Sequence, residues 1–258
     1  MTEKNFASIA IVRAIPNTFQ DCVTMSPGKP EINVALARQQ HAAYCKILEQ
    51  LGLKLICMEA DDALPDCCFT EDIAIVFDDL AIITKPGTSS RIAETIEMEK
   101  IVTPLKKIHH LSSPATIDGG DVLKIDHKIF IGISSRTNEE AIKQVAAIIH
   151  PKGYDVIGVK IRDTLHLKSV CTYIGNGCIL LAKGHMDEKI FSQYDTIIIP
   201  EEEAYSANCL VVNGKVLLPK GFPKTKSMIE AKGFSVIEMD MSEIEKADGA
   251  LTCLSIIF

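Results

Sequence analysis

The chain has 258 residues, of which 47% are hydrophobic, and its formal net charge is −7. This length and composition suffice to bury a sizeable core, so we expect one soluble domain over residues 1–258. The acidic charge and the lack of a Lys/Arg cluster exclude a typical nucleic-acid binder, and no apolar run approaches the roughly 20 residues that span a bilayer.

Apolar runs of strand length alternate with helix-like stretches along the chain. Residues 8–15 predict a strand, residues 33–52 a helix, and residues 54–59 a second strand. Four hairpins follow, each made of two apolar runs joined by a tight polar turn, at residues 73–84, 121–132, 171–182 and 209–219. The turn at 213–214 is the clearest, because its Asn-Gly dipeptide tolerates the positive φ angles of a type I′ turn.

Helices and further strands follow the hairpins. Helix-like stretches occupy residues 89–102, 138–150, 188–194 and 224–232, and strand-like runs occupy residues 155–161, 196–200 and 234–239. Asn138 is a suitable N-cap for the second of these helices. The repeated unit is therefore hairpin, helix, strand. Its turn centres recur after about 50 and then about 40 residues, a spacing typical of a ring or an array.

The two ends of the chain supply a fifth unit. It combines the predicted strand at 8–15, the helix at 33–52, the strand at 54–59 and the apolar segment ALTCLSIIF at 250–258, which reads as a buried strand. If this last strand pairs with the first, the repeats close into a ring and no sheet edge of an open array is left exposed. We therefore expect an α/β ring of five repeated units.

A polar residue that the strand pattern does not require stands before or at the start of each internal hairpin. These residues are Glu71 and Asp72, Asp118 and Asp121, His166, and Asn208, and Cys253 takes the corresponding place in the fifth unit. In a ring, positions of the same phase converge on the axis. We therefore expect a nucleophile, a base and an electrostatic clamp to meet in one pocket.

Each of these residues also has a purely structural interpretation. Cys253 in an apolar strand could be a packing residue, His166 a hydrogen-bonded structural histidine, and DGGD at 118–121 an ordinary turn. Their common phase in successive repeats favours chemistry instead.

A guanidinium ligand suits this set of groups. Carboxylates around a thiol raise its pKa unless the substrate brings positive charge. A guanidinium remains protonated, pairs with carboxylates and, once bound, favours the anionic form of Cys253. We therefore expect a thiol that is neutral until substrate binds, a covalent thiouronium-type intermediate, and His166 as the acid for the departing amine and then the base for water.

The other cysteines are expected to be reduced packing residues. Nine cysteines is an odd number, the spacing is irregular, and the N-terminal segment lacks the apolar core of a secretion signal. These features favour a cytoplasmic protein over a disulfide framework. The adjacent Cys67 and Cys68 have no second pair at the spacing of a zinc finger, so we expect no structural zinc.

Seven segments resemble a known family. They are CCFTEDIAIV (67–76), ITKPGTSSR (83–91), TIDGGDVL (116–123), GISSRTN (132–138), LHLKS (165–169), SANC (206–209) and EKADGALTC (245–253). From about residue 11 to its end, the sequence resembles the dimethylarginine dimethylaminohydrolases, members of the pentein or amidinotransferase superfamily. The resemblance implies a five-bladed αβ propeller of ββαβ units. It also implies hydrolysis of N-methylated arginines to citrulline and a methylamine, without an organic cofactor.

The matching motifs imply roles for the reacting groups. Cys253 would be the nucleophile, His166 the general acid and base, and Asp118 the carboxylate that orients the imidazole. Asp72, assisted by Glu71, would hold the substrate guanidinium.

The same resemblance implies how the amino-acid end of the substrate is held. Asp66 would help to bind the α-amino group, and Arg91 and Arg136 would take the carboxylate, a task that suits their forked donors. Taken singly, either arginine also reads as a surface charge. Val23, in a lid over residues 17–30, would offer its backbone carbonyl, and the backbone at Ala247 would touch the ligand.

Alternatives remain open at this point. An arginine deiminase would act on unmethylated arginine, an amidinotransferase would pass the amidino group to an amine, and a guanidine-binding module would lack turnover. The intact set of Cys253, His166 and Asp118 weighs against a pure binder. No metal is required, although Cys253 is a candidate ligand of inhibitory Zn²⁺. The expected partner is a small guanidino amino acid, and the chain would be a monomer or a homodimer.

Overall fold

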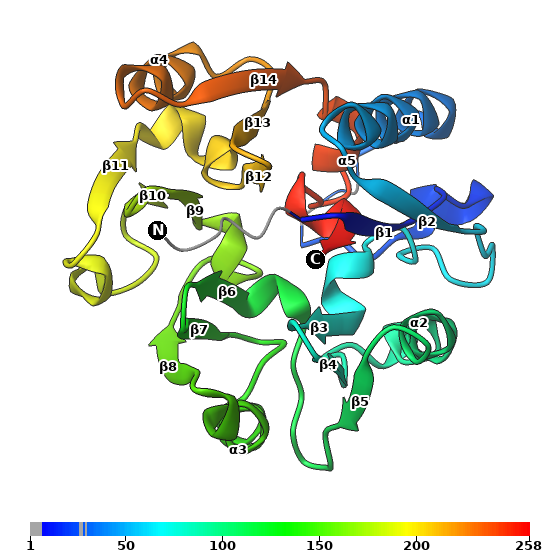
Figure 1. The fold of residues 1–258 in the computed structure, drawn as a ribbon. Helices are drawn as coiled ribbons and strands as arrows, with labels where there is room; N and C mark the ends of the chain where they lie inside the picture. The colour runs from blue at the N-terminus through cyan, green and yellow to red at the C-terminus, as the bar shows by residue number, and fades with distance from the viewer. Residues whose placement is uncertain (1–6, 26–27, 29) are drawn as a thin grey trace.

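Five three-stranded sheets form a ring around a central axis (Figure 1). The computed structural model describes residues 7–25, 28 and 30–258. In every sheet the inner strand is antiparallel to the middle strand, and the middle strand is parallel to the outer strand. From inner to outer, the sheets are β15 (Ser255–Ile257), β1 (Ile9–Arg13) and β2 (Lys54–Met58); β3 (Ala74–Val76), β4 (Leu80–Ile83) and β5 (Lys107–His110); β6 (Val122–Ile125), β7 (Lys128–Ile133) and β8 (Asp155–Lys160); β9 (Cys171–Gly175), β10 (Cys178–Ala182) and β11 (Asp195–Ile199); and β12 (Leu210–Val212), β13 (Lys215–Pro219) and β14 (Ser235–Met239).

Helices connect the middle strand to the outer strand and lie on the outside of the ring (Figure 1). They are α1 (Val34–Gln50), α2 (Glu94–Val102), α3 (Glu139–Ile149) and α4 (Pro223–Ala231), and a 3₁₀ turn at Glu188–Phe191 takes this place between β10 and β11. The short α5 (Ser242–Glu245) precedes β15. No helix of the described residues is long and apolar enough to cross a membrane.

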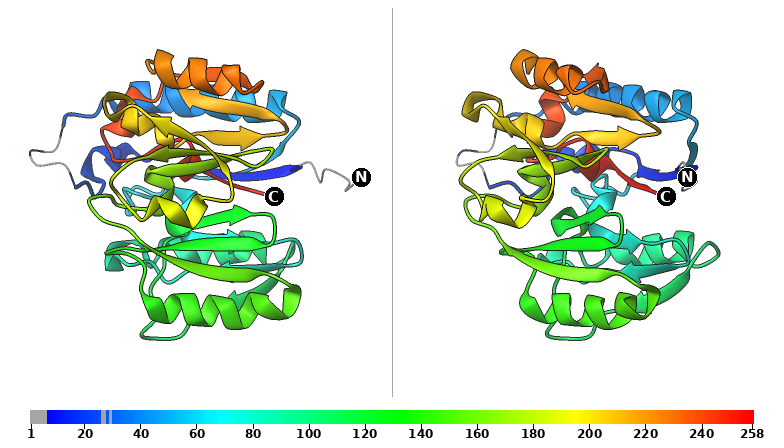
Figure 2. Two further views of the ribbon diagram at one scale, coloured as in Figure 1. Left: turned by 90° about the vertical axis from the view of Figure 1, so that its left-hand side faces the viewer. Right: turned by 60° about the vertical axis from the view of Figure 1, so that its left-hand side comes forward.

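The predicted ring of five repeats is confirmed, including its closure. Ala10 pairs with Ile257 and Val12 with Ser255, so β1 and β15 share one sheet. The backbone N–H of Ser8 donates to the Phe258 carbonyl at 3.0 Å, and the blue β1 lies beside the red β15 (Figure 2). Closure in this way leaves each strand of the seam with a partner.

Local sequence signals explain several element boundaries. The Asn138 side chain accepts from the Ala141 N–H at 3.0 Å and caps α3, as predicted. Asn213 and Gly214 adopt φ angles of 46° and 83°, as the predicted type I′ turn requires. The sheets are then joined by buried apolar side chains, among them a cluster that contains Ile82 of β4 and Ile129 of β7.

Three expectations about the elements were wrong. The helix expected over 89–102 begins only at Glu94, because residues 89–91 form a 3₁₀ turn. The outer strand β5 was not anticipated, because its sequence KIHH lacks an apolar run. Cys253 does not lie within a strand: residues 252–254 form a 3₁₀ turn, in which the Cys253 N–H donates to the Ala250 carbonyl at 3.2 Å, and β15 starts after it.

A short 3₁₀ turn precedes each of the five inner strands. These turns are Thr70–Ile73, Gly119–Asp121, Leu167–Ser169, Glu201–Ala207 and Thr252–Leu254. They occupy equivalent places around the axis, and the polar residues singled out in the sequence lie in them or next to them.

Candidate active site

One cavity on the axis brings together all but one of the predicted site residues. It is lined by Val23, Asp66, Asp72, Arg91, Asp118, Arg136, His166, Ala247 and Cys253, with Phe69, Leu165, Asp248 and Gly249. Its volume is about 30 Å³, which is room for one or two water molecules and not for an amino acid. Binding of an amino acid in this cavity therefore requires the cavity walls to move.

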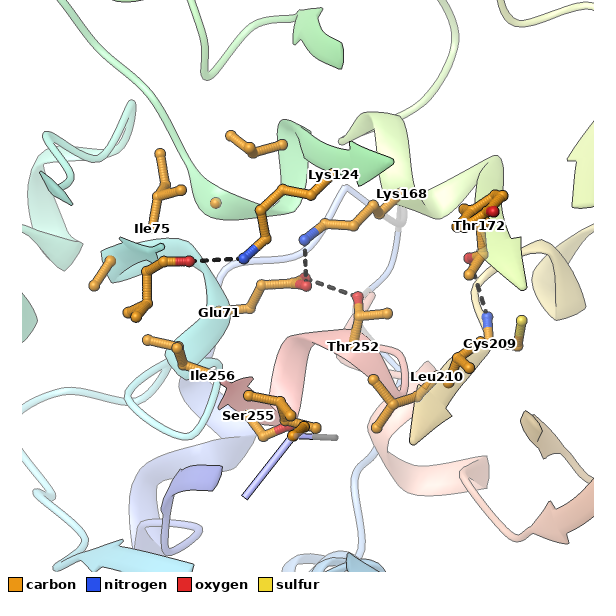
Figure 3. A pocket seen from close by; sticks show the side chains of 18 residues that line it. Glu71, Ile75, Lys124, Lys168, Thr172, Cys209, Leu210, Thr252, Ser255 and Ile256 are labelled. Carbon is orange, nitrogen blue, oxygen red and sulfur yellow. Dashed lines mark hydrogen bonds and ion pairs between the residues drawn. The ribbon is translucent and has the colours of Figure 1, made fainter. Parts of the chain in front are cut away.

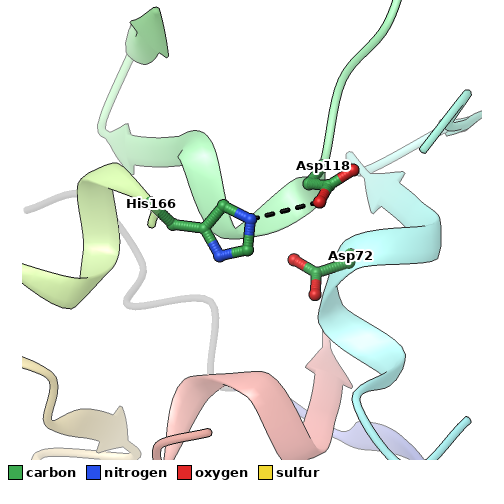
Figure 4. Close-up of side chains that lie close together, drawn as sticks. All are labelled: Asp72, Asp118 and His166. Atoms are coloured by element: carbon green, nitrogen blue, oxygen red, sulfur yellow. Dashed lines mark hydrogen bonds and ion pairs between the residues drawn. The ribbon is translucent and has the colours of Figure 1, made fainter. Parts of the chain in front are cut away.

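His166 and Asp118 form a hydrogen-bonded pair at this cavity (Figure 4). His166 Nε2 lies 3.1 Å from Asp118 Oδ2, and Asp118 Oδ1 accepts the Gly87 N–H at 2.9 Å. Burial lowers the pKa of His166, but the nearby Asp72 charge and the bond to Asp118 outweigh it and raise the pKa to about 9. The imidazole is therefore protonated at neutral pH and can act as an acid.

Asp72 faces the same imidazole from the 3₁₀ turn that precedes β3, in a third repeat (Figure 4). Its Oδ1 accepts the Gly120 N–H at 2.9 Å, and its Oδ2 accepts from Arg91 Nη1 at 2.5 Å. Burial raises the pKa of this carboxyl, but the charges of His166 and Arg91 prevail and hold it below its usual value. Asp72 is therefore a buried anion that suits a cationic ligand.

The two glycines of the DGGD segment permit the close approach of these groups. A Cβ on Gly120 would lie 2.6 Å from His166 Nδ1, and a Cβ on Gly119 would lie 1.9 Å from the Glu71 carbonyl oxygen. Asp121, at the end of the segment, accepts the Leu167 N–H at 2.9 Å and so fixes the turn that follows His166. Both glycines and Asp121 of the DGGD segment therefore have a role at this site, so the segment is more than an ordinary turn.

Cys253 lies half-buried at the edge of the cavity. Burial raises the pKa of its thiol, and the charges of Glu71 and Asp72 raise it further, while Lys168 acts in the opposite direction. These directions agree with the expectation that the thiol is neutral without a ligand. A cationic ligand placed beside the thiol would favour the thiolate.

Arg91 occupies part of the space expected for a substrate. Its Nε contacts both Glu94 carboxylate oxygens at 3.1 Å, and its Nη2 donates to Glu94 at 2.7 Å and to the Phe69 carbonyl at 2.8 Å. Its Nη1 donates to Asp72. The family resemblance predicts Arg91 at the carboxylate end of the ligand and Asp72 at the guanidinium end, and in this structure the two side chains are instead bonded to each other.

The lid segment is held by carboxylates of the cavity wall. The Val23 N–H lies 3.1 Å and 3.3 Å from the two Asp66 oxygens, and the Met25 N–H donates to Asp248. Burial raises the pKa of Asp66. Ser26, Pro27 and Lys29 of the predicted lid lie outside the described residues. Asp66 and Val23 are thus adjacent, as a shared contact to an α-amino group requires.

Glu71 lies elsewhere than predicted. Its carboxylate pairs with Lys168 and accepts from Thr252 Oγ1 at 2.7 Å, and it does not line the cavity. The reason is the 3₁₀ turn: with three residues per turn, consecutive side chains point about 120° apart, so Glu71 and Asp72 diverge. Asn208 also lies off the cavity, where its Oδ1 accepts the Thr252 N–H at 3.1 Å.

Sequence reasoning missed the residues that support Cys253 from behind. Thr252 Oγ1 accepts from the Asn208 side-chain amide at 3.0 Å and donates to Glu71, and the Glu71 carboxylate in turn pairs with Lys168. Thr252 and Lys168 were not singled out in the sequence, because the nearby Cys253 and His166 already explained the motifs in which they lie. Their position next to Cys253 and His166 in the sequence was the available clue.

Three atoms near the axis could in principle share a metal ion. Among the described residues, Asp72, Asp118 and His166 offer one ligand atom each, all within 4.8 Å of one another (Figure 4). Their present state does not fit a cation, since Asp72 is paired with Arg91 and His166 carries a proton. Cys253 is not a member of this group, so the expectation of an inhibitory zinc ligand stays a prediction.

Comparisons with known proteins agree on one family. The family model described as N,N dimethylarginine dimethylhydrolase, eukaryotic, matches residues 13–257. The chain is 36% identical over 251 residues to N(G),N(G)-dimethylarginine dimethylaminohydrolase of Pseudomonas aeruginosa, covering 96% of this chain and 98% of that protein. It is 33% identical over 230 residues to the enzyme of that name from Streptomyces coelicolor, covering 88% of each.

Solved structures show the same likeness. The Pseudomonas aeruginosa enzyme, as a cysteine-to-serine mutant complexed with citrulline, superposes with a TM-score of 0.95 at 33% identity, covering 98% of this chain and 100% of that one. A histidine-to-glycine dimethylarginine dimethylaminohydrolase, as an adduct with S-methyl-L-thiocitrulline, has a TM-score of 0.94. The N-terminal domain of ArgZ, a cyanobacterial arginine dihydrolase, shares the fold alone, at 16% identity and a TM-score of 0.89.

Proposed function

The chain belongs to the dimethylarginine dimethylaminohydrolase family, and from this premise we propose that it hydrolyses N-methylated L-arginine to L-citrulline and methylamine or dimethylamine. The observation that carries the proposal is the cavity in which a thiol, a protonated imidazole and a buried anion face one another. The protein is thus a hydrolase of the C–N bond of linear amidines, and it uses no organic cofactor.

In the proposed complex, the two ends of the substrate bind different residues of the cavity wall. The guanidinium binds at Asp72 and displaces Arg91 from it, after which Arg91 turns to the α-carboxylate together with Arg136. The α-amino group lies between the Asp66 carboxylate and the Val23 carbonyl. These assignments are supported by the lining of the cavity and by the adjacency of Asp66 and Val23.

The bound cation prepares the nucleophile. Arg91 is not among the main charges that act on the pKa of Cys253, whereas the guanidinium carbon of a bound substrate must reach the thiol. The substrate's positive charge there offsets the carboxylates that raise this pKa, so the thiol releases its proton to solvent. The thiolate adds to the guanidinium carbon and forms a C–S bond. His166, protonated at rest, then gives its proton to the methylated nitrogen as the C–N bond breaks, which releases the amine and leaves a covalent thiouronium group.

Water completes the reaction. The neutral His166, held by Asp118, takes a proton from water as the oxygen adds to the same carbon. Cleavage of the C–S bond restores the thiolate and leaves O-protonated citrulline, whose hydroxyl proton passes to solvent to give citrulline, and His166 is again protonated. Glu71 has no direct contact in this scheme, and it acts on Cys253 through Thr252 and through its charge.

A parallel assay tests this function. Dimethylarginine, monomethylarginine and arginine are each incubated with the protein, and citrulline and the released amine are quantified. Citrulline and amine in equal amounts from the methylated substrates are expected, and Cys253→Ser should abolish both. Turnover of arginine alone would assign a deiminase, and turnover only with an added amine acceptor would assign an amidinotransferase. Binding without turnover would leave a guanidine-binding module.

Three further expectations belong to this proposal. Residues 7–25, 28 and 30–258 include both strands of the seam between β1 and β15, which favours a single catalytic domain over residues 1–258. The nine cysteines all lie among the described residues and none of them forms a disulfide, which favours a reducing compartment such as the cytoplasm. We also propose a monomer or homodimer, which analytical ultracentrifugation would distinguish.

A further inference from the structure

A second and larger cavity lies on the axis beyond the catalytic turns. It has a volume of about 530 Å³, and we call it the axial chamber. All five inner strands, β3, β6, β9, β12 and β15, contribute to its wall, and its floor is formed by Glu71, Gly119, Lys168 and Thr252. In the sequence, each floor residue lies one or two positions from a residue that lines the catalytic cavity. The 3₁₀ turns therefore separate two chambers.

Two lysines enter the axial chamber, but only one of them is paired with a carboxylate (Figure 3). Lys168 forms an ion pair with Glu71. Lys124, from β6, donates to the Val76 carbonyl at 2.7 Å, and its Nζ lies 5.5 Å from the centre of the Phe77 ring. In the described part of the chain, Lys124 forms no ion pair. The floor of the chamber thus carries an excess of one positive charge.

The surroundings of Lys124 leave its charge poorly compensated. Its side chain is exposed, and the chamber that it enters is open to solvent. Desolvation by the surrounding protein still lowers the pKa of Lys124 to about 8, and the charge of Lys168 contributes, against the opposing effects of Asp78 and Glu71. An anion beside Lys124 would remove this cost.

The walls above the two lysines are mostly apolar. Ile75, Leu210, Val211 and Ile256 of three inner strands line the chamber, together with Thr172, Tyr173 and Ser255. A volume of 530 Å³ lies within the range of about 300–1,000 Å³ typical of small-molecule sites, which combine apolar walls with few charged groups. The occupant that matches both features has one negative charge and a short apolar body.

We propose that the axial chamber binds a small aliphatic monocarboxylate, with its carboxylate at Lys124 and Lys168 and its hydrocarbon against the inner strands. A single carboxylate matches the excess of one positive charge, whereas a polyanion would be repelled by Glu71. A neutral analogue would leave Lys124 uncompensated. This site is separate from the catalytic cavity and its occupancy does not depend on turnover.

The site is coupled to the catalytic cavity through the floor. A carboxylate that competes for Lys168 leaves the Glu71 charge less compensated, and that charge raises the pKa of Cys253. If the proposed hydrolase activity holds, the occupant therefore lowers kcat/KM. This consequence rests on the proposed function, while binding itself does not.

The binding experiment uses the full chain and 3-methylbutanoate as probe, with 3-methylbutanamide as its neutral counterpart. Methyl NMR signals of Ile75 and Ile256 report the axial chamber, and those of Leu165 report the catalytic cavity. We expect the carboxylate, with a Kd on the order of 1 mM, to shift the chamber signals. The amide should not shift them. Equal shifts by both compounds, shifts confined to Leu165, or no shift would overturn the proposal.

Two variants sharpen the test. Lys124→Gln removes the charge and should weaken binding about tenfold, whereas Lys54→Gln removes an exposed lysine from β2 and should leave binding unchanged. The wild-type comparison of acid and amide does not depend on either variant folding. In the kinetic arm, the carboxylate but not the amide should lower kcat/KM of the wild type and have little effect on Lys124→Gln. Chamber shifts without citrulline production would refute the hydrolase activity and retain the site.

Discussion

The Asp118→Asn substitution tests how His166 is kept protonated. The substitution preserves shape and can retain the bond from the Gly87 N–H, but it removes the carboxylate from the bond of 3.1 Å to His166 Nε2. A hydrogen bond between charged groups contributes about 1.5–3 kcal/mol, which equals about one to two pKa units. The pKa of His166, about 9 in the wild type, should fall by that amount.

The measurement is an NMR titration of the His166 ring, together with the pH dependence of kcat/KM. The basic limb of the rate profile should move to lower pH by the same amount as the titration, since His166 must be protonated to release the amine. Glu99→Gln, which removes the carboxylate 3.2 Å from the exposed His110, is the matched control and should change neither. An unchanged titration of His166 in Asp118→Asn would show that the pair does not set its charge.

The pair of His166 and Asp118 also predicts how the free energy of unfolding changes with pH. Because the pKa of His166 rises from 6.5 to about 9 on folding, the folded state binds the proton more tightly. At 1.36 kcal/mol per unit, this contributes about 3 kcal/mol, fully present below pH 6.5 and lost as the pH rises through 9. The difference in unfolding free energy between wild type and Asp118→Asn should therefore shrink between pH 6 and about 10. A difference that is constant over this range would contradict it.

Three further predictions concern neighbouring features. Gly120→Ala places a Cβ 2.6 Å from His166 Nδ1 and should reduce kcat/KM by about 100-fold with an unchanged circular dichroism spectrum; near-normal activity would refute the close-approach argument. Lys168→Met leaves Glu71 unpaired and should cost about 3 kcal/mol in denaturant unfolding. Adding Glu71→Gln should recover most of this, and no recovery would argue against the pair. Asn138→Ala removes the cap of α3 and should lower the urea midpoint by an amount equal to about 1 kcal/mol; an unchanged midpoint would count against it.

The fold was predictable because short sequence patterns mark the turns and helix starts of the repeated units. The Asn213-Gly214 turn and the Asn138 cap each require particular residues, so the sequence marks these boundaries directly. The closure of the ring followed from counting units. By contrast, β5 pairs with β4 through its backbone, and its half-exposed side chains need not be apolar, so its sequence carries no pattern.

The site was predictable at the level of segments but not of side-chain direction. Equivalent positions in five repeats must converge on the axis, and Asp72, Asp118 and His166 do lie together there. The direction of Glu71, however, depends on a 3₁₀ turn, in which a shift of one residue rotates a side chain by about 120°. No pattern of hydrophobic residues marks such a short turn. The resting contact of Arg91 with Asp72 was likewise invisible, since it joins residues of different predicted roles.

The contact between Arg91 and Asp72 turns ligand binding into an exchange reaction. In this structure a guanidinium already lies on this carboxylate, so in the proposed mechanism an incoming guanidino compound replaces one cation by a chemically similar one. The attraction between charges then nearly cancels in the net free energy of binding. What remains to decide between ligands is the difference between them and an arginine side chain, namely the methyl groups on the guanidinium and the fit of these groups to the wall. Selectivity for substituted guanidines would follow from competition with the chain's own arginine.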